Sequence, residues 1–122
     1  MPGASPRILA PLPIFGDGTQ TRSFCYIDDL VEGLYRLLMS DVHEPVNLGN
    51  PNEITIRELA EATNRLTGSR GGIVVQPERR DASDPERRQP DIRRAKEQLD
   101  WAPTIDLDTG LSRTIADFRS RT

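Results

Sequence analysis

Four stretches of the chain place apolar residues at the spacing of an amphipathic helix. They cover residues 28–40, 55–68, 91–101 and 106–118. Asp28, Asp91 and Asp106 are predicted N-caps of three of these helices. The remaining one begins with a Thr55/Glu58 capping box and is expected to end at Gly68.

Short runs of β-branched, aromatic and other apolar residues predict strands between these helices. They lie at residues 13–15, 22–27, 46–49 and 73–75. Gly16 and Gly18 form a turn after the first strand, and the polar residues 77–90 are predicted to be irregular. Residues 1–10 are expected to be a loose lead-in. The fold class is therefore α/β, a small mixed α/β unit with short strands.

Length and composition limit what this unit can be. With 122 residues and 13.7 kDa it has room for one domain. No apolar run approaches the roughly 20 residues of a membrane-spanning helix, and the first residues do not resemble a signal peptide. Cys25 is the single cysteine, which excludes an internal disulfide and a cysteine-rich zinc site. We expect a cytoplasmic protein without a bound metal.

The charge balance is acidic, with 16 basic and 19 acidic residues and a net charge of −3. All basic residues except Lys96 are arginines, which suit bidentate contacts with phosphate or carboxylate. Aromatic residues make up 5% of the chain. Because nucleic-acid binding normally shows clustered basic residues, we expect no nucleic-acid partner. For Arg79, Arg80, Arg93 and Arg94 we expect surface ion pairs.

Residues for catalysis are scarce in the sequence. Tyr26 and Tyr35 are followed four positions later by Leu30 and Met39, so no Tyr-x-x-x-Lys pair exists. The glycines form no dinucleotide-binding fingerprint. His43 is the single histidine and lies in a polar loop. We expect no catalytic residue in this chain.

Two carboxylates and a thiol could suggest other chemistry. Asp28 and Asp29 are adjacent, but a helix N-terminus favours acidic residues without any catalytic role. Cys25 falls in a predicted strand, where a half-buried structural thiol is expected rather than a nucleophile.

Five sequence motifs in a fixed order resemble the extended short-chain dehydrogenase/reductase family, which contains nucleotide-sugar epimerases, dehydratases and decarboxylases. They are PLPIFGDGTQTRSFCYIDDL from residue 11, PVNLGN from 45, TIRELA from 55, DPERRQPDI from 84 and LDWAP from 99. The second half of the first motif and the fourth motif most resemble UDP-glucuronate decarboxylases. The similarity implies that residues 11–122 are the C-terminal nucleotide-sugar-binding lobe of such an enzyme.

The resemblance also implies a set of substrate-binding residues. The family's strand along the nucleotide corresponds to Pro11, Leu12, Pro13, Ile14 and Phe15, with Phe15 where a tyrosine is usual. Arg22 and Arg88 correspond to arginines that hold the nucleotide diphosphate, and Asn47 to an asparagine near the nucleotide. Such contacts are physically reasonable, because guanidinium groups form charge-assisted hydrogen bonds with phosphates.

In this family the N-terminal Rossmann half binds NAD and supplies the catalytic Tyr/Lys pair, and the whole enzyme is a homodimer. The resemblance thus implies a fragment of an NAD-dependent enzyme that converts UDP-glucuronate to UDP-xylose and CO2. Alone, this chain is expected to bind no NAD and to be inactive. Two alternatives stay open: a fragment of another nucleotide-sugar epimerase or 4,6-dehydratase, and a non-catalytic module that binds a nucleotide-sugar or a partner. A fragment should also expose a contiguous apolar patch.

Overall fold

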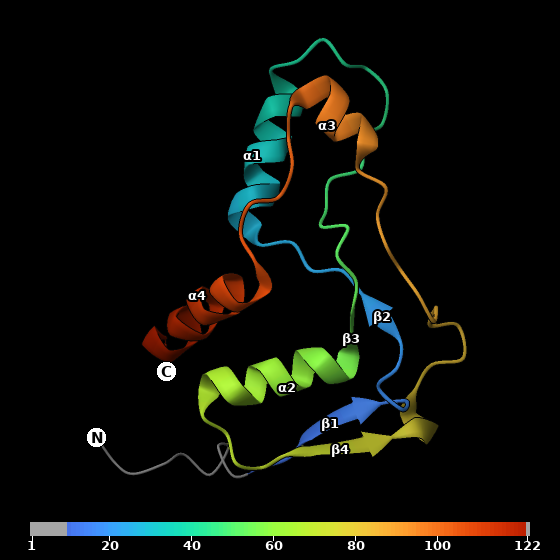
Figure 1. Cartoon of the computed structure of the whole chain (residues 1–122), viewed down its shortest axis with the longest axis vertical. Coiled ribbons are helices and arrows are strands. Elements are labelled where there is room, and N and C mark those ends of the chain that lie inside the picture. Colours follow the sequence, from blue (N-terminus) through green and yellow to red (C-terminus); the bar gives the residue numbers. More distant parts are fainter. Residues whose placement is uncertain (1–9, 122) are drawn as a thin grey trace.

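The computed structural model describes residues 10–121. The elements are strands β1 (Leu12–Phe15), β2 (Thr21–Arg22), β3 (Ile54–Thr55) and β4 (Ile73–Gln76), helices α1 (Ile27–Leu38), α2 (Ile56–Thr67), α3 (Arg93–Leu99) and α4 (Leu107–Ser120), and a short 3-10 helix η2 (Pro77–Arg79). Figure 1 shows α1 and α3 together in one part of the molecule, with α2, β1 and β4 at the opposite end. The lead-in predicted for residues 1–10 lies almost entirely outside the described residues.

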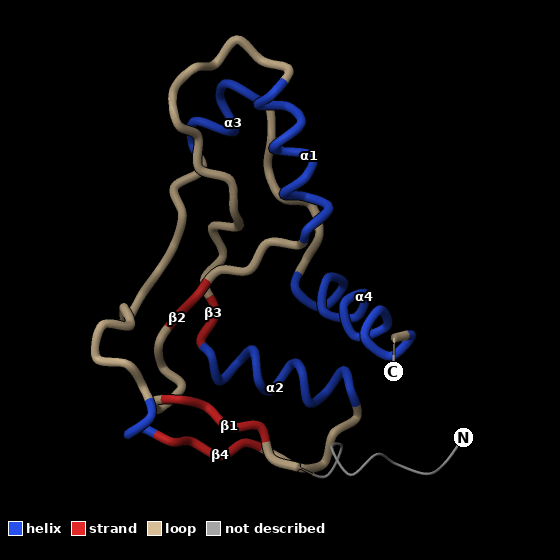
Figure 2. The backbone as a smooth tube through the Cα atoms, turned by 180° about the vertical axis from the view of Figure 1, so that it is seen from behind, coloured by secondary structure: helices blue, strands red, loops and turns tan. Residues whose placement is uncertain are grey.

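The four strands form two separate two-stranded sheets. In the first, β1 runs parallel to β4, with Leu12 opposite Ile73 and Phe15 opposite Gln76. Parallel strands need a long crossover, and here it contains β2, α1, β3 and α2. In the second, β2 and β3 pair antiparallel over two residues each. Figure 2 shows this small pair between the two ends of the molecule.

The larger core joins α1 and α3. Ile92, Ala95, Leu99 and Trp101 form its buried cluster. Gly33 of α1 is buried against this core, because a Cβ there would lie 3.0 Å from side-chain atoms of Leu48 and Trp101. Glycine at this position therefore permits the close approach of α1.

Asp29 connects α1 to the segment that precedes α4. Its carboxylate accepts hydrogen bonds from the Thr104 N–H at 3.0 Å, the Thr104 hydroxyl at 3.0 Å and the Ile105 N–H at 2.9 Å. Its backbone carbonyl accepts a bond of 2.9 Å from the Trp101 indole. Asp29 is 6% exposed. It therefore has a structural role, and its buried charge is balanced by three donors.

Helix signals in the sequence are largely confirmed. The Thr55/Glu58 capping box is present, and α2 ends at Gly68, whose φ of 73° is left-handed. Asp106 caps α4 by accepting from the Thr109 N–H at 2.8 Å. The strands predicted at residues 13–15 and 73–75 correspond to β1 and β4.

Two predicted caps are wrong. The N-cap of α1 is Tyr26, so Asp28 lies inside the first turn of the helix. The N-cap of α3 is Ile92, one residue after Asp91. Asp91 still accepts a hydrogen bond of 3.1 Å from the Arg93 N–H. In both cases an acidic residue lies at the helix start, where the dipole favours it, but does not occupy the capping position.

Two predicted strands also differ. Residues 46–49 form no strand; within the described part of the chain no neighbouring strand pairs with them, and Val46 and Leu48 pack on the α1–α3 core instead. The strand predicted at 22–27 is reduced to Thr21–Arg22, because its partner β3 is two residues long. Residues 23–26 then lead unpaired into α1.

Candidate functional site

The main candidate site is a pocket of about 640 Å³ beside the ends of β1 and β2. Its lining comprises Pro13, Ile14, Phe15, Gln20, Arg22, Ile56, Arg79, Arg80, Asp81, Ser83, Asp84, Pro85 and Arg88. It thus combines the apolar end of β1 with the polar segment that follows β4. Four arginines and two aspartates line it, so the surplus of charge is positive and suits an anion.

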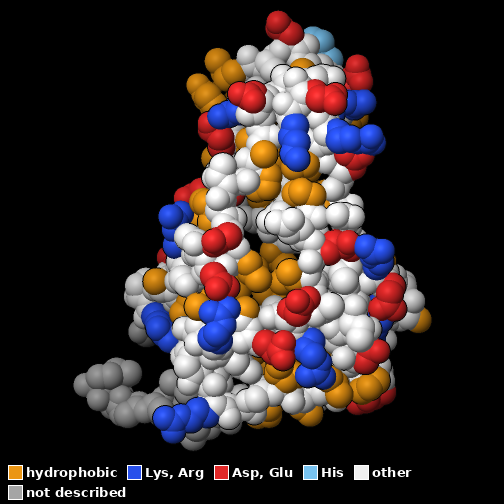
Figure 3. Space-filling model, in the orientation of Figure 1, with side chains coloured by type: hydrophobic (Ala, Val, Ile, Leu, Met, Phe, Trp, Pro, Cys, Tyr) orange, Lys and Arg blue, Asp and Glu red, His pale blue; other side chains and the backbone are white. Residues whose placement is uncertain are grey.

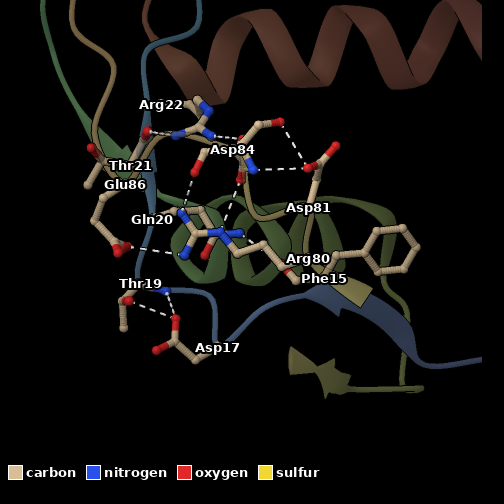
Figure 4. A network of polar contacts seen from close by, with 11 residues as sticks. Phe15, Asp17, Thr19, Gln20, Thr21, Arg22, Arg80, Asp81, Asp84 and Glu86 are labelled. Atoms are coloured by element: carbon tan, nitrogen blue, oxygen red, sulfur yellow. Dashed lines mark hydrogen bonds and ion pairs between the residues drawn. The ribbon is translucent and has the colours of Figure 1, made fainter. Parts of the chain in front are cut away.

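Arg22 reaches the pocket from β2 and forms an ion pair with Asp84. The same carboxylate accepts a hydrogen bond of 3.2 Å from Nε of Arg80. Arg80 also approaches Glu86, with 3.4 Å between Nη1 and Oε1. Figure 4 shows Arg22 and Arg80 both turned toward Asp84. Asp84 therefore holds two guanidinium groups close together at the pocket wall.

The segment that carries Arg88 is tied to β2 by several contacts. The Thr21 N–H donates to the Glu86 carbonyl at 2.8 Å, and the Ser23 hydroxyl donates to the Arg88 carbonyl at 3.4 Å. Glu53 accepts from the Thr21 hydroxyl at 2.8 Å and from Nε of Arg87 at 3.1 Å. The hydrogen bonds from Arg87 and Thr21 lower the pKa of Glu53 below its usual value. These contacts place Arg88 on the same pocket as Arg22 although 66 positions separate them.

The apolar side of the pocket ends at Phe15. Phe15 is 47% exposed, and the Arg79 guanidinium lies 4.9 Å from the centre of its ring, a cation–π contact. Gly16 follows with a φ of 97°, and a Cβ there would lie 2.9 Å from Cδ of Arg80. Glycine is therefore required where the chain turns beside the arginines.

Gln20 lies on the inner wall of the pocket and is 4% exposed. Its Nε2 donates to the Phe15 carbonyl at 2.8 Å, which links the residue before β2 to the end of β1. Its Oε1 is buried and has no hydrogen-bond partner in the structure. Gln20 therefore leaves one acceptor at the pocket wall unsatisfied.

The structure brings five of the eight residues of the expected substrate site together. Pro13, Ile14, Phe15, Arg22 and Arg88 line the main pocket. Pro11 and Leu12 lie at the other end of the β1 segment and do not line it.

Asn47 is not brought to the main pocket. It is exposed and lines a separate pocket of about 440 Å³ together with Asp91, Arg93 and Arg94. Its Nδ2 lies 3.4 Å from the Asp91 carbonyl. The loop containing residues 46–49 packs on the α1–α3 core, and this position separates Asn47 from Arg22 and Arg88.

Sequence reasoning missed eight residues that line the main pocket, among them Gln20, Arg79, Arg80 and Asp84. Arg80 does form the expected ion pairs, but it does so at the pocket wall. Arg79 and Arg80 follow β4 almost directly, and β4 pairs with β1, which was assigned to the nucleotide. Recognising that pairing would have placed both arginines near Phe15.

The remaining groups considered for chemistry are Cys25, His43 and Asp28. Burial raises the pKa of the Cys25 thiol, which disfavours the nucleophilic thiolate. His43 is exposed, and Asp28 lies 3.9 Å from Arg113 at the surface. Within residues 10–121, no group of three or more His, Cys, Asp or Glu side chains could hold a metal ion. In the same range, no helix is long and apolar enough to cross a membrane.

The glycine turn after β1 differs from the turn that binds a dinucleotide. Gly16 and Gly18 form a turn from β1 toward β2, whereas a dinucleotide pyrophosphate binds where a glycine-rich turn opens a helix. The main pocket instead presents separate guanidinium groups beside an exposed aromatic ring. That arrangement fits a phosphate-bearing ligand with an apolar or planar part.

Comparisons with known proteins agree with this geometry. A family model described as GDP-mannose 4,6 dehydratase matches residues 6–114. UDP-glucuronic acid decarboxylase 1 from Arabidopsis thaliana is 50% identical over 111 residues, which cover 91% of this chain and 25% of that protein. Its namesake from Danio rerio is 50% identical over 107 residues, 88% of this chain and 25% of that protein. The chain thus spans about a quarter of these curated relatives.

Solved structures share the fold. An epimerase from Methanothermobacter thermautotrophicus is 35% identical with a TM-score of 0.87, covering 93% of this chain and 34% of that one. UDP-glucuronic acid 4-epimerase from Bacillus cereus, solved with UDP-glucuronic acid and NAD, is 29% identical with a TM-score of 0.81. The match covers 92% of this chain and 36% of that one. With the family match over most of the sequence, these similarities show that the chain belongs to the GDP-mannose 4,6 dehydratase family, within the extended short-chain dehydrogenases/reductases.

Proposed function

We propose that this chain is the UDP-sugar-binding portion of a UDP-glucuronate decarboxylase, which converts UDP-glucuronate to UDP-xylose and CO2. The observation that supports this most directly is the position of Arg22 and Arg88 on one pocket. A UDP-sugar carries two phosphate charges, and two guanidinium groups from separate segments can bind them with charge-assisted hydrogen bonds. The exposed ring of Phe15 lies on the same pocket and can contact the nucleoside.

The choice of reaction rests on the sequence relatives. The curated relatives at about 50% identity are named UDP-glucuronic acid decarboxylases. A second candidate, a 4-epimerase of UDP-glucuronate or a related sugar, is favoured by the solved structures, several of which are epimerases. The structures are less similar in sequence than the decarboxylases, so we favour decarboxylation.

NAD would be bound by a part of a longer polypeptide that this chain does not span. We further propose a cytoplasmic enzyme that acts as a homodimer.

Calorimetry with a series of uracil ligands tests the binding proposal. We expect the chain to bind UDP and UDP-glucuronate, and to bind UMP at least about tenfold more weakly than UDP, since each charged hydrogen bond contributes about 1.5–3 kcal/mol. Uridine should bind more weakly still. Equal affinities for UMP and UDP, or no binding of either, would contradict the proposal.

An activity assay tests the fragment interpretation separately. We expect the purified chain to retain no NAD and to form no UDP-xylose from UDP-glucuronate. Turnover by the pure chain would overturn this interpretation while leaving the nucleotide-binding proposal intact.

A further inference from the structure

Arg80 lies on the wall of the main pocket, and all three nitrogen atoms of its guanidinium group contact the protein. Its Nε donates to Oδ2 of Asp84 at 3.2 Å, and its Nη2 donates to the Asp84 backbone carbonyl at 3.2 Å. Its Nη1 lies 3.4 Å from Oε1 of Glu86. Figure 4 shows the guanidinium group between Asp84 and Glu86. Arg79 and Arg88, by contrast, are exposed residues of the same pocket.

The contacts of Arg80 connect three segments that form the pocket. A Cβ on Gly16 would lie 2.9 Å from Cδ of Arg80, so the stem of Arg80 packs on the turn after β1. The Glu86 carbonyl accepts a hydrogen bond of 2.8 Å from the Thr21 N–H of β2. Arg88 follows Glu86 by two positions. Arg80 therefore fastens the segment that carries Arg88 to the ends of both strands of the pocket.

Charged pairs are common on this part of the surface, but the pair of Arg80 and Asp84 is less exposed than most. Figure 3 shows basic and acidic side chains next to each other over the lower half of the molecule, where the β1–β4 sheet lies. Exposed pairs contribute little to stability, because water screens them. The side chains of Arg80 and Asp84 are only 20% and 32% exposed, and the planar guanidinium contacts side chain and backbone together.

Asp84 shares its two carboxylate oxygens between two arginines. Oδ1 pairs with Arg22, and Oδ2 pairs with Arg80. Without Arg80 the whole charge of the carboxylate would act on Arg22, and a phosphate would have to compete with it for that guanidinium. Arg80 thus offsets a negative charge that would otherwise oppose the binding of an anion.

We propose that Arg80 is a positioning residue of the main pocket. It draws Asp84 partly away from Arg22 and fixes the segment of Arg88, so that Arg22 and Arg88 are available to the phosphates of one ligand. Arg80 keeps its contacts with the protein and does not itself bind phosphate. This role rests on the proposed function, in which Arg22 and Arg88 bind a diphosphate.

A double-mutant cycle, measured by calorimetry with UDP, tests this role. We expect Arg80→Gln to weaken UDP binding by about fivefold or more, because Asp84 then competes for Arg22. In an Asp84→Ala background the same substitution should weaken binding by about twofold or less, since the carboxylate that Arg80 offsets is gone. An arginine that contacts phosphate directly would lose the same factor in both backgrounds.

Arg36→Gln is the matched control. The Arg36 guanidinium also contacts a carboxylate and backbone carbonyls at the opposite end of the molecule; they belong to Glu32, Leu99 and Asp100. We expect both single variants to lower the thermal midpoint, and Arg80→Gln alone to weaken UDP binding. A further variant, Arg80→Lys, keeps the charge and loses the planar fork, so it should recover only part of the affinity.

The positioning role is wrong if Arg80→Gln or Arg80→Lys binds UDP as tightly as the unmodified chain. It is also wrong if Arg80→Gln costs the same factor with and without the Asp84 carboxylate, or if Arg36→Gln weakens binding equally, since lost stability would then explain the effect. Failure of the proposed function looks different: the unmodified chain would itself bind no UDP, and the role of Arg80 would fail with it.

Discussion

Asp84 lies between Arg22 and Arg80, where the proposed phosphate groups would bind. Its carboxylate keeps both guanidinium groups at the pocket wall, and it also repels an incoming anion. These two effects oppose each other. The first depends on hydrogen-bonding atoms, which an asparagine partly keeps, and the second depends on charge alone.

Replacement of Asp84 by Asn separates the two effects. We expect Asp84→Asn to bind UDP several-fold more tightly than the unmodified chain, because a negative charge beside the phosphates is removed while the shape is kept. Calorimetry at low and high salt measures this, with Ser83→Ala as the neighbouring control. Weaker binding would show instead that the charge of Asp84 is needed to position the arginines.

Glu53 gives a prediction for acid stability. Hydrogen bonds from Arg87 and Thr21 lower the pKa of Glu53 in the folded protein. The ionised carboxylate therefore contributes its whole stabilisation of the folded state above the pKa that Glu53 has in the unfolded chain, about 4.3. The effect disappears as pH falls through the lower folded pKa. We expect Glu53→Gln to be less stable than the unmodified chain at pH 7, with the difference shrinking below about pH 4.3.

Urea unfolding at a series of pH values measures this difference. The control is Glu61→Gln, an exposed position on α2. If Glu53→Gln changed the free energy of unfolding equally at about pH 3 and at about pH 7, the expected link between the pKa of Glu53 and stability would be contradicted.

At the scale of elements, the sequence predicted those helix ends that depend on neighbouring residues alone. The Thr55/Glu58 box and the Gly68 end of α2 are local signals and were correctly predicted. The strand expected at residues 46–49 does not form. A strand needs a hydrogen-bonding partner that is distant in the sequence, and a local residue pattern carries no information about that partner. The pocket was predictable only in part for the same reason: Arg79 and Arg80 join it through the pairing of β4 with β1.

The capping box provides the test at this scale. The Thr55 hydroxyl accepts from the Glu58 N–H at 3.0 Å, and the Thr55 N–H donates to the Glu58 carboxylate at 2.8 Å. We expect Thr55→Ala to lower the free energy of unfolding by about 1 kcal/mol. Denaturant unfolding measures it, with Glu61→Gln, at an exposed position of the same helix, as control. Equal losses for the two variants would show that the box adds no stability.

At the scale of the whole molecule, two parts with separate contacts form one structure. The α1–α3 core lies at one end, and the sheet of β1 and β4 with α2 lies at the other (Figure 1). The pocket is at the second end, and exposed apolar side chains of α1 lie at the first.

Asp29 is the polar link between α1 and the segment leading to α4. We expect Asp29→Asn to reduce the free energy of unfolding by about 2 kcal/mol or more, because the amide cannot accept from all three donors of Thr104 and Ile105. Denaturant unfolding measures this loss. Asp28→Asn, on the exposed side of the same turn, should change it little. Similar stabilities of the two variants would contradict the structural role of Asp29.

The central claim is that Arg22 and Arg88 bind one diphosphate. Calorimetric titration of UDP into the unmodified chain, Arg22→Ala, Arg88→Ala and the control Arg93→Ala tests it most directly; Arg93 lines the other pocket and pairs with Asp91. We predict that each of the first two substitutions weakens UDP binding by about tenfold or more and that Arg93→Ala leaves it unchanged. Undiminished affinity in a correctly folded Arg22→Ala or Arg88→Ala chain would contradict the claim.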